Sequence, residues 1–195
     1  MTLSEHLLVY VSLILGIAVA RNLAGLAHLL VYRDRVIFDG VFLAWGIFFI
    51  FVPAADWWDL LHWPPFKTVF IWDYFWLLVR PMVLFLICAL LFTGLHERDG
   101  GEIDLRAHFE RVRPWLFSLG AVYTLLSVIG EAAYEWVRLP VSEEVFSDAA
   151  IVDISLSLVI IALLVAGALV RRRAYHVFLF PAVLVLFVML FTLGE

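Results

Sequence analysis

Six ionisable side chains lie within apolar stretches of this sequence, where a charge is poorly solvated. They are two bases and four acids: Arg21, Asp73, Arg80, Glu131, Glu135 and Asp153. A charged side chain at a bilayer centre costs about 2.5–3.5 kcal/mol on insertion scales, so such residues usually face a partner, a cavity or an ion path. We interpret these six as candidate ligand- or ion-binding residues. The acids would hold a cation or a proton, while an arginine tunes their charge state or binds an anionic group.

The spacing of these residues predicts which of them meet. Asp73 and Arg80 lie seven residues apart, nearly two helical turns, so they share a face but are about 10 Å apart along the axis. Arg80 therefore needs a partner from another helix. Glu131 and Glu135 lie one turn apart, and two anions there repel each other unless they are protonated or countered. We expect Arg80 to pair with these glutamates, and with Glu131 first.

Pro81 follows Arg80 directly and removes the backbone N–H that would reach the carbonyl of Leu77. It predicts a kink and an available acceptor beside the arginine. Two hypotheses stay open at this point. One is a polar pocket that opens to the outer side of the membrane. The other is a structural arrangement in which Asp73 lies at the headgroups and Arg80 snorkels or makes a single ion pair.

The composition indicates that the helices of this chain lie in a membrane. Hydrophobic residues make up 65% of the 195 positions and charged residues 16%, against roughly 45–50% and about 25% in soluble domains. A spanning helix needs about 20 mostly apolar residues. The sequence predicts an all-α transmembrane bundle of six helices in a single domain over residues 1–195. The expected spans are 7–31, 36–55, 69–94, 115–137, 149–170 and 174–193.

The longest joint contains the segment IDLRAHFERVRPW. Its apolar residues Leu105, Phe109 and Val112 recur at helical spacing beside several arginines. This pattern is typical of an amphipathic helix that lies on a membrane surface, and it predicts such a helix at 103–113.

The arginines and lysines of the joints orient the chain. Nine lie in the joints after the first, third and fifth spans, and two lie in the joints after the second and fourth. Cytoplasmic joints carry the excess of positive charge. We therefore expect three out–in–out hairpins in a plasma membrane, with both termini on the non-cytoplasmic side.

Small residues at every fourth position indicate faces where helices approach closely. Ser12, Gly16, Ala20 and Ala24 form one such series, and Ala162 with Ala166 forms another. Packing within the chain is the favoured interpretation, and contact with another subunit is the alternative.

Other kinds of site find little support in the sequence. The cluster of His62 with Asp56 and Asp59 fits exposed acids at a helix end better than a metal site. There is no nucleophile elbow, zinc-protease motif or phosphate loop. We therefore expect no metal and no cofactor, and we do not favour an enzyme. The basic 103–113 segment suits lipid headgroups better than nucleic acid.

The segment SLILGIAVARNLAGLAHLL, followed by IDLRAHFERVRPW, resembles small six-span proteins of bacterial inner membranes. The resemblance implies a multi-pass protein of that membrane, and it implies no activity. We expect a small transporter or channel with an outward-facing polar site for a cation or proton. The alternative is a non-catalytic subunit or assembly partner of a larger membrane complex. Its partners would be the lipid bilayer and either a second copy or another membrane protein.

Overall fold

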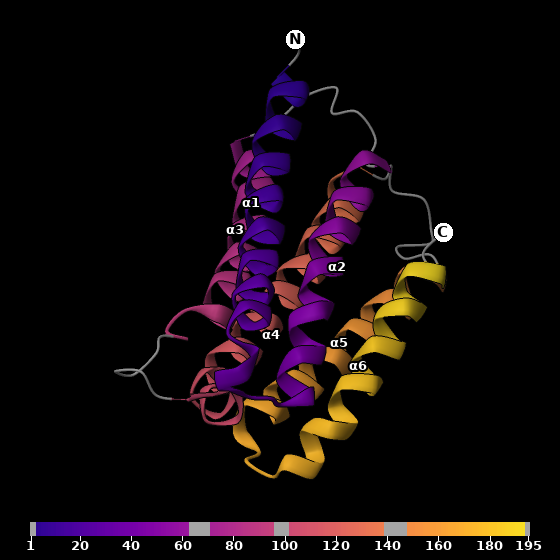
Figure 1. Cartoon of the computed structure of the whole chain (residues 1–195). Coiled ribbons are helices and arrows are strands. Elements are labelled where there is room, and N and C mark those ends of the chain that lie inside the picture. The colour runs from indigo at the N-terminus through magenta and orange to yellow at the C-terminus, as the bar shows by residue number, and fades with distance from the viewer. Residues whose placement is uncertain (1–2, 63–70, 96–101, 139–147, 194–195) are drawn as a thin grey trace. The chain divides into compact units, whose positions relative to one another are not determined.

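The structure, a computed structural model, describes residues 3–62, 71–95, 102–138 and 148–193 (Figure 1). It confirms the predicted all-α class, because this part of the chain forms six helices that are each long and apolar enough to cross a membrane. They are α1 (Leu3–Val31), α2 (Gly40–His62), α3 (Ile71–Phe92), α4 (Leu105–Arg138), α5 (Asp148–Leu169) and α6 (Arg173–Leu193). The short elements are the 3₁₀ turn η1 (Arg33–Arg35) and the strands β1 (Val36–Ile37) and β2 (Ile103–Asp104).

The packing divides the chain into two compact units, Met1–Leu116 and Phe117–Glu195. The first contains α1, α2, α3 and the start of α4. The second contains the rest of α4 with α5 and α6. A single domain over 1–195 stays a prediction.

In the first unit, α1 packs along α3 and α2 (Figure 1). Its buried side chains recur every three or four residues, which is the period of a helix that buries one face. They include Leu7, Val11, Leu15, Ala18, Asn22 and Leu29. Close approach depends on two glycines that face the ring of Phe92. A Cβ atom at Gly25 would overlap that ring, and one at Gly46 would lie 3.2 Å from it.

The small residues singled out from the sequence lie elsewhere on α1. Nothing lies within 4 Å of a Cβ atom built at Gly16, and Ala20 and Ala24 are exposed. Ala162 on α5 is exposed as well. The described residues of their own units therefore do not cover these four residues, and their packing inside the chain stays a prediction. Spacing alone finds a small-residue face but does not tell whether the chain itself covers it.

A proline in α2 explains a buried polar contact between three helices. Pro53 has no N–H, so the carbonyl of Phe49 loses its usual donor four residues later. Asn22 of α1 fills this role, because its Nδ2 donates to that carbonyl at 2.8 Å. The thiol of Cys88 on α3 lies 3.6 Å from the same oxygen. Both side chains are fully buried, so the open carbonyl ties all three helices together.

The strands β1 and β2 form a short parallel pair, with Val36 opposite Ile103. Each strand leads through an aspartate into a helix. Asp39 before α2 accepts the N–H groups of the residues two and three positions later, at 2.9 and 3.0 Å. Asp104 before α4 does the same at 2.9 and 3.0 Å. A carboxylate at this position satisfies N–H groups that the first turn of a helix leaves open.

The predicted surface helix at 103–113 is not a separate element, and this prediction was wrong. Residues from Leu105 onward form the first turns of α4, which continues through Pro114 without a break. The apolar stripe of Leu105, Phe109 and Val112 is buried by the protein. An apolar stripe beside arginines looks the same in a sequence whether lipid or protein covers it, so the pattern could not decide.

In each unit, a histidine side chain donates a hydrogen bond to a carbonyl at the C-terminal end of a helix. The Nε2–H of His108 donates to the carbonyl of Leu91, in the last turn of α3, at 2.9 Å. In the second unit, the Nε2–H of His176 donates to the carbonyl of Val170, just after α5, at 2.9 Å. The carbonyls at a helix C-terminus lack intrahelical donors, so each imidazole satisfies one of them.

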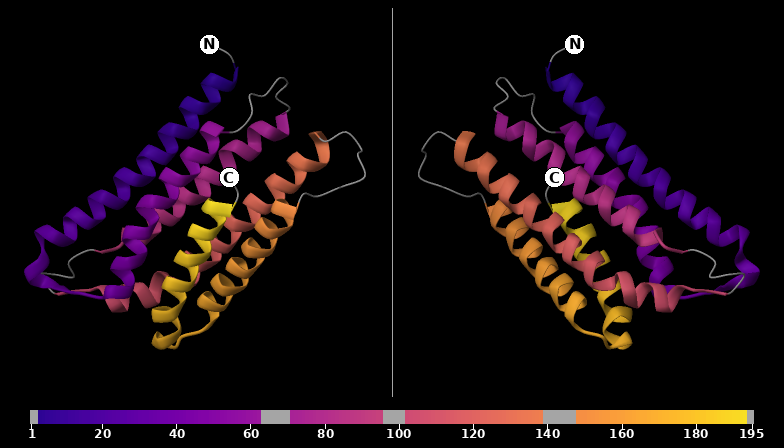
Figure 2. Two further views of the ribbon diagram at one scale, coloured as in Figure 1. Left: turned by 90° about the vertical axis from the view of Figure 1, so that its right-hand side faces the viewer. Right: turned by 90° about the vertical axis from the view of Figure 1, so that its left-hand side faces the viewer.

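The second unit is built on α5 and α6, which run antiparallel to each other (Figure 2). Gly167 of α5 allows close packing, since a Cβ there would lie 2.8 Å from Leu179 and 3.2 Å from Phe117. Hydroxyl groups such as those of Ser127 and Ser155 donate to the carbonyl four residues earlier. Within a membrane, such bonds satisfy a hydroxyl without a partner from another helix.

Candidate functional site

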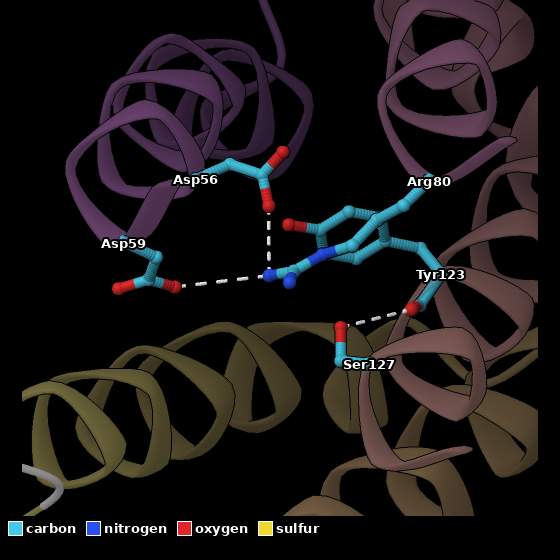
Figure 3. Close-up of polar contacts among 5 residues, drawn as sticks. All are labelled: Asp56, Asp59, Arg80, Tyr123 and Ser127. Atoms are coloured by element: carbon cyan, nitrogen blue, oxygen red, sulfur yellow. Dashed lines mark hydrogen bonds and ion pairs between the residues drawn. The ribbon is translucent and has the colours of Figure 1, made fainter. Parts of the chain in front are cut away.

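Arg80 of α3 lies between two carboxylates of α2, all within the first unit (Figure 3). Its Nη2 is 2.7 Å from Oδ1 of Asp56 and 3.7 Å from Oδ2 of Asp59. The side chains differ in exposure: Arg80 is 18% exposed, Asp56 6% and Asp59 48%. Asp56 therefore makes a short, buried ion pair, and Asp59 makes a longer contact with solvent access.

The length of α2 explains why the sequence did not reveal this pairing. The second span was expected to end at residue 55, because two aspartates follow. The helix instead continues to His62 and carries Asp56 and Asp59 one turn apart on one face. The signal that could have found them is this three-residue spacing on the helix that precedes α3.

A small pocket of about 20 Å³ adjoins the charged residues. It has room for about one water molecule. Besides the three charged residues, it is lined by Val11, Leu60, Trp76, Leu77 and Pro81. Pro81 cannot donate to the carbonyl of Leu77, as the sequence predicted, and both residues line the pocket. The site thus combines carboxylates with apolar walls and an open helix carbonyl.

In this cluster, two carboxylates of α2 face one guanidinium of α3. The bond from Asp56 is short and charge-assisted, and its burial makes removal of either partner costly. Asp59 is weakly held by comparison, because solvent screens a half-exposed pair at 3.7 Å. A proton or a small cation at Asp59 could replace the guanidinium as its counter-charge. Within the described ranges, no three His, Cys, Asp or Glu side chains gather as metal ligands.

The other candidate residues do not join this cluster in the described part of the chain. Arg21 of α1 is exposed and does not line the pocket. Asp153 belongs to α5 in the second unit, where its Oδ1 is buried and has no hydrogen-bond partner among the described residues.

The remaining three candidates, Asp73, Glu131 and Glu135, have side chains outside the described residues, although α3 and α4 include their positions. The pairing of Arg80 with Glu131 therefore stays a prediction. The described geometry rests on α2 and α3 alone.

Comparison with known proteins finds no protein that is similar to this chain. No protein-family model matches the chain, and no curated protein and no solved structure matches it. The function must therefore be inferred from the residues and their geometry.

Proposed function

We propose that this chain is a small membrane transporter or channel that moves a proton or a small cation through the site of Arg80, Asp56 and Asp59. The observation that carries the proposal is a water-sized pocket lined by two carboxylates and one guanidinium, at which the carboxylate of Asp59 is half exposed. A carboxylate with access to solvent attracts protons and cations. The proposed location is a bacterial inner membrane with both termini outside, which the distribution of arginines supports.

The two aspartates would have different roles in this mechanism. Asp56 holds Arg80 in place through the short, buried bond, so the guanidinium stays beside the pocket. Asp59 is the exchangeable group, because it is half exposed and lies 3.7 Å from Nη2 of Arg80. A proton or cation that reaches Asp59 neutralises it and loosens its contact with the arginine. Departure of the ion restores the contact.

The test is ion flux through the purified protein in liposomes, with dyes for proton, sodium and potassium movement. We expect Asp59→Asn to lower the flux about tenfold, as if loss of the carboxylate raised the limiting barrier by roughly 1.4 kcal/mol. Asp34→Asn is the matched control, because Asp34 is 92% exposed and lies outside the pocket. Wild-type liposomes that leak no faster than protein-free ones, for all three ions, would refute the proposal.

The orientation has its own test. Cys88 is the only cysteine and is buried, so a cysteine introduced by Arg172→Cys can be labelled selectively. A membrane-impermeant maleimide should react with it in inverted vesicles and not in intact spheroplasts. Labelling in spheroplasts would show that this joint faces outward and would reverse the proposed topology.

The second candidate function is a non-catalytic subunit of a membrane complex. The observation that favours it is one face of α1, where Gly16, Ala20 and Ala24 form a small-residue face that the described residues of the first unit do not cover. Helices in membranes associate through such faces.

A further inference from the structure

Arg21 lies on the exposed side of α1, far from both ends of the helix. Ten residues separate it from Val31 at the helix end, which is about 15 Å at 1.5 Å per residue. The hydrocarbon core of a bilayer is about 30 Å thick. If α1 crosses the membrane as its length and composition allow, Arg21 lies near the middle of the core.

The described residues provide no counter-charge for Arg21. Ion pairs are formed by Arg33, Arg80 and Arg113, and none includes Arg21. An arginine at this depth destabilises an isolated helix in lipid, and membrane proteins usually place such a residue against a partner. The partner that Arg21 lacks among the described residues is an anionic group at the same depth.

The surface around Arg21 has room for a helix to provide that group. Ala20 and Ala24 lie beside it on the exposed side of α1, and a Cβ at Gly16 would meet no atom within 4 Å. Small side chains let two backbones approach closely. A close approach also shortens the distance between the two charges, which strengthens their attraction in the low-dielectric core of the membrane.

We infer that this face of α1 docks a transmembrane helix of another protein, and that this helix carries an aspartate or glutamate at the depth of Arg21. The inference goes beyond ion movement at Arg80, because Arg21 does not line that pocket. For the alternative function as a subunit, it defines the partner as a transmembrane helix with an acidic residue. It rests on the membrane location and not on transport.

Charge complementarity selects this occupant over two others. A second copy related by a two-fold axis normal to the membrane would place Arg21 opposite Arg21 at equal depth, and like charges repel. A lipid phosphate lies at the membrane surface, about half the core thickness away from Arg21. A carboxylate within a spanning helix can meet the guanidinium directly, and bidentate geometry favours that pair.

The test uses the full chain in phosphatidylcholine liposomes and a synthetic leucine–alanine transmembrane helix as the probe. The probe carries an acceptor dye, and the protein carries a donor on the cysteine of Arg172→Cys. Three probes are compared: one with a central aspartate, one with leucine at that position, and one with the aspartate moved seven residues toward an end. We expect the central aspartate to bind about 5- to 30-fold more tightly than leucine, the range for polar contacts of roughly 1–2 kcal/mol between membrane helices.

Variants of the chain locate the contact. Arg21→Leu should abolish the preference for aspartate, and Gly16→Leu should weaken binding of the central-aspartate probe by blocking close approach. Arg33→Leu is the matched control, because Arg33 is 74% exposed beyond the end of α1, and it should leave the preference unchanged. Circular dichroism should show equal helix content for Arg21→Leu and wild type, since Arg21 is exposed and has no described partner.

Three results would each overturn the inference. Equal binding of the aspartate and leucine probes would show that Arg21 does not recognise a carboxylate at its depth. A preference that persists in Arg21→Leu would place the contact elsewhere. Self-association of the wild-type chain that disappears in Arg21→Leu would make a second copy the occupant. Ion flux is measured on the same liposomes without probe, so a failure of docking and a failure of transport are read separately.

Discussion

Asn22→Leu tests whether the carbonyl released by Pro53 holds α1, α2 and α3 together. In the wild-type chain, Nδ2 of Asn22 donates to the carbonyl of Phe49 at 2.8 Å. Leucine removes this donor and leaves a buried acceptor. The second perturbation, Pro53→Ala, restores a backbone N–H at position 53, which can donate to the carbonyl of Phe49 as in an ordinary helix. In that background, Asn22→Leu should lower the free energy of unfolding much less.

The magnitude follows from the groups involved. An unsatisfied buried acceptor costs about 1–3 kcal/mol, but polar contacts between membrane helices average roughly 0.6 kcal/mol and reach about 1.7. Asn22→Leu also removes Oδ1, which is buried and has no hydrogen-bond partner in the described part of the chain, so part of the loss is offset. The thiol of Cys88 at 3.6 Å is a weak substitute donor. We expect Asn22→Leu to lower the free energy of unfolding by about 1 kcal/mol.

The assay is reversible unfolding by SDS in mixed micelles, followed by circular dichroism, for wild type, both single variants and the double variant. Pro53→Ala costs stability through lost buried contacts, and the double-mutant cycle cancels that term. The predicted coupling is about 1 kcal/mol, with Asn22→Leu nearly neutral in the Pro53→Ala background. If Asn22→Leu costs the same in both backgrounds, within roughly 0.5 kcal/mol, the proposed role of the open carbonyl is wrong.

Three further substitutions test local features of the fold by the same unfolding assay. Gly25→Ala should lower the free energy of unfolding by about 1–3 kcal/mol, because the added methyl overlaps the ring of Phe92. Asp104→Ala should cost about 1 kcal/mol through loss of two hydrogen bonds at the start of α4. His108→Phe should cost about 1–3 kcal/mol, because the ring is retained while the buried carbonyl of Leu91 loses its donor.

Each of these substitutions has a matched control. Gly16→Ala adds the same methyl to the same helix where nothing lies within 4 Å, so it should not destabilise. Asp104→Asn keeps a side-chain oxygen at the cap and should retain most of the stability. A Gly25→Ala variant as stable as Gly16→Ala would contradict the close packing of α1 on α3. A neutral His108→Phe would show that the end of α3 needs no donor from α4.

The helices themselves could be predicted from the sequence because membrane thickness fixes their length. Hydropathy located all six, and α1 and α6 end at the expected residues, Val31 and Leu193. Hydropathy did not predict where α2 ends, because charged residues belong to its last turns. Asp56 and Asp59 suggested the end of a span, yet their backbone is helical and a guanidinium from α3 stabilises their charge.

The candidate site was predicted only in part for the same reason. Arg80, with its adjacent proline, stood out because an arginine is costly in an apolar stretch. Its partners on α2 could not be identified, because pairing depends on which faces meet. The glycines of α1 show this clearly. Gly16 and Gly25 belong to one helix, yet only Gly25 lies against a ring, and residue type does not reveal which face is covered.

The strand pair β1–β2 has a consequence for biogenesis. Its halves are separated along the chain by the whole of α2 and α3, so the pair cannot close until both helices have left the ribosome and inserted. Such non-local contacts form late, because the intervening chain must first be ordered. Closure also brings the start of α4 to the first unit, where Leu105 becomes fully buried. Closure of the pair therefore depends on the earlier placement of α2 and α3, and it connects the start of α4 to the segment that precedes α2.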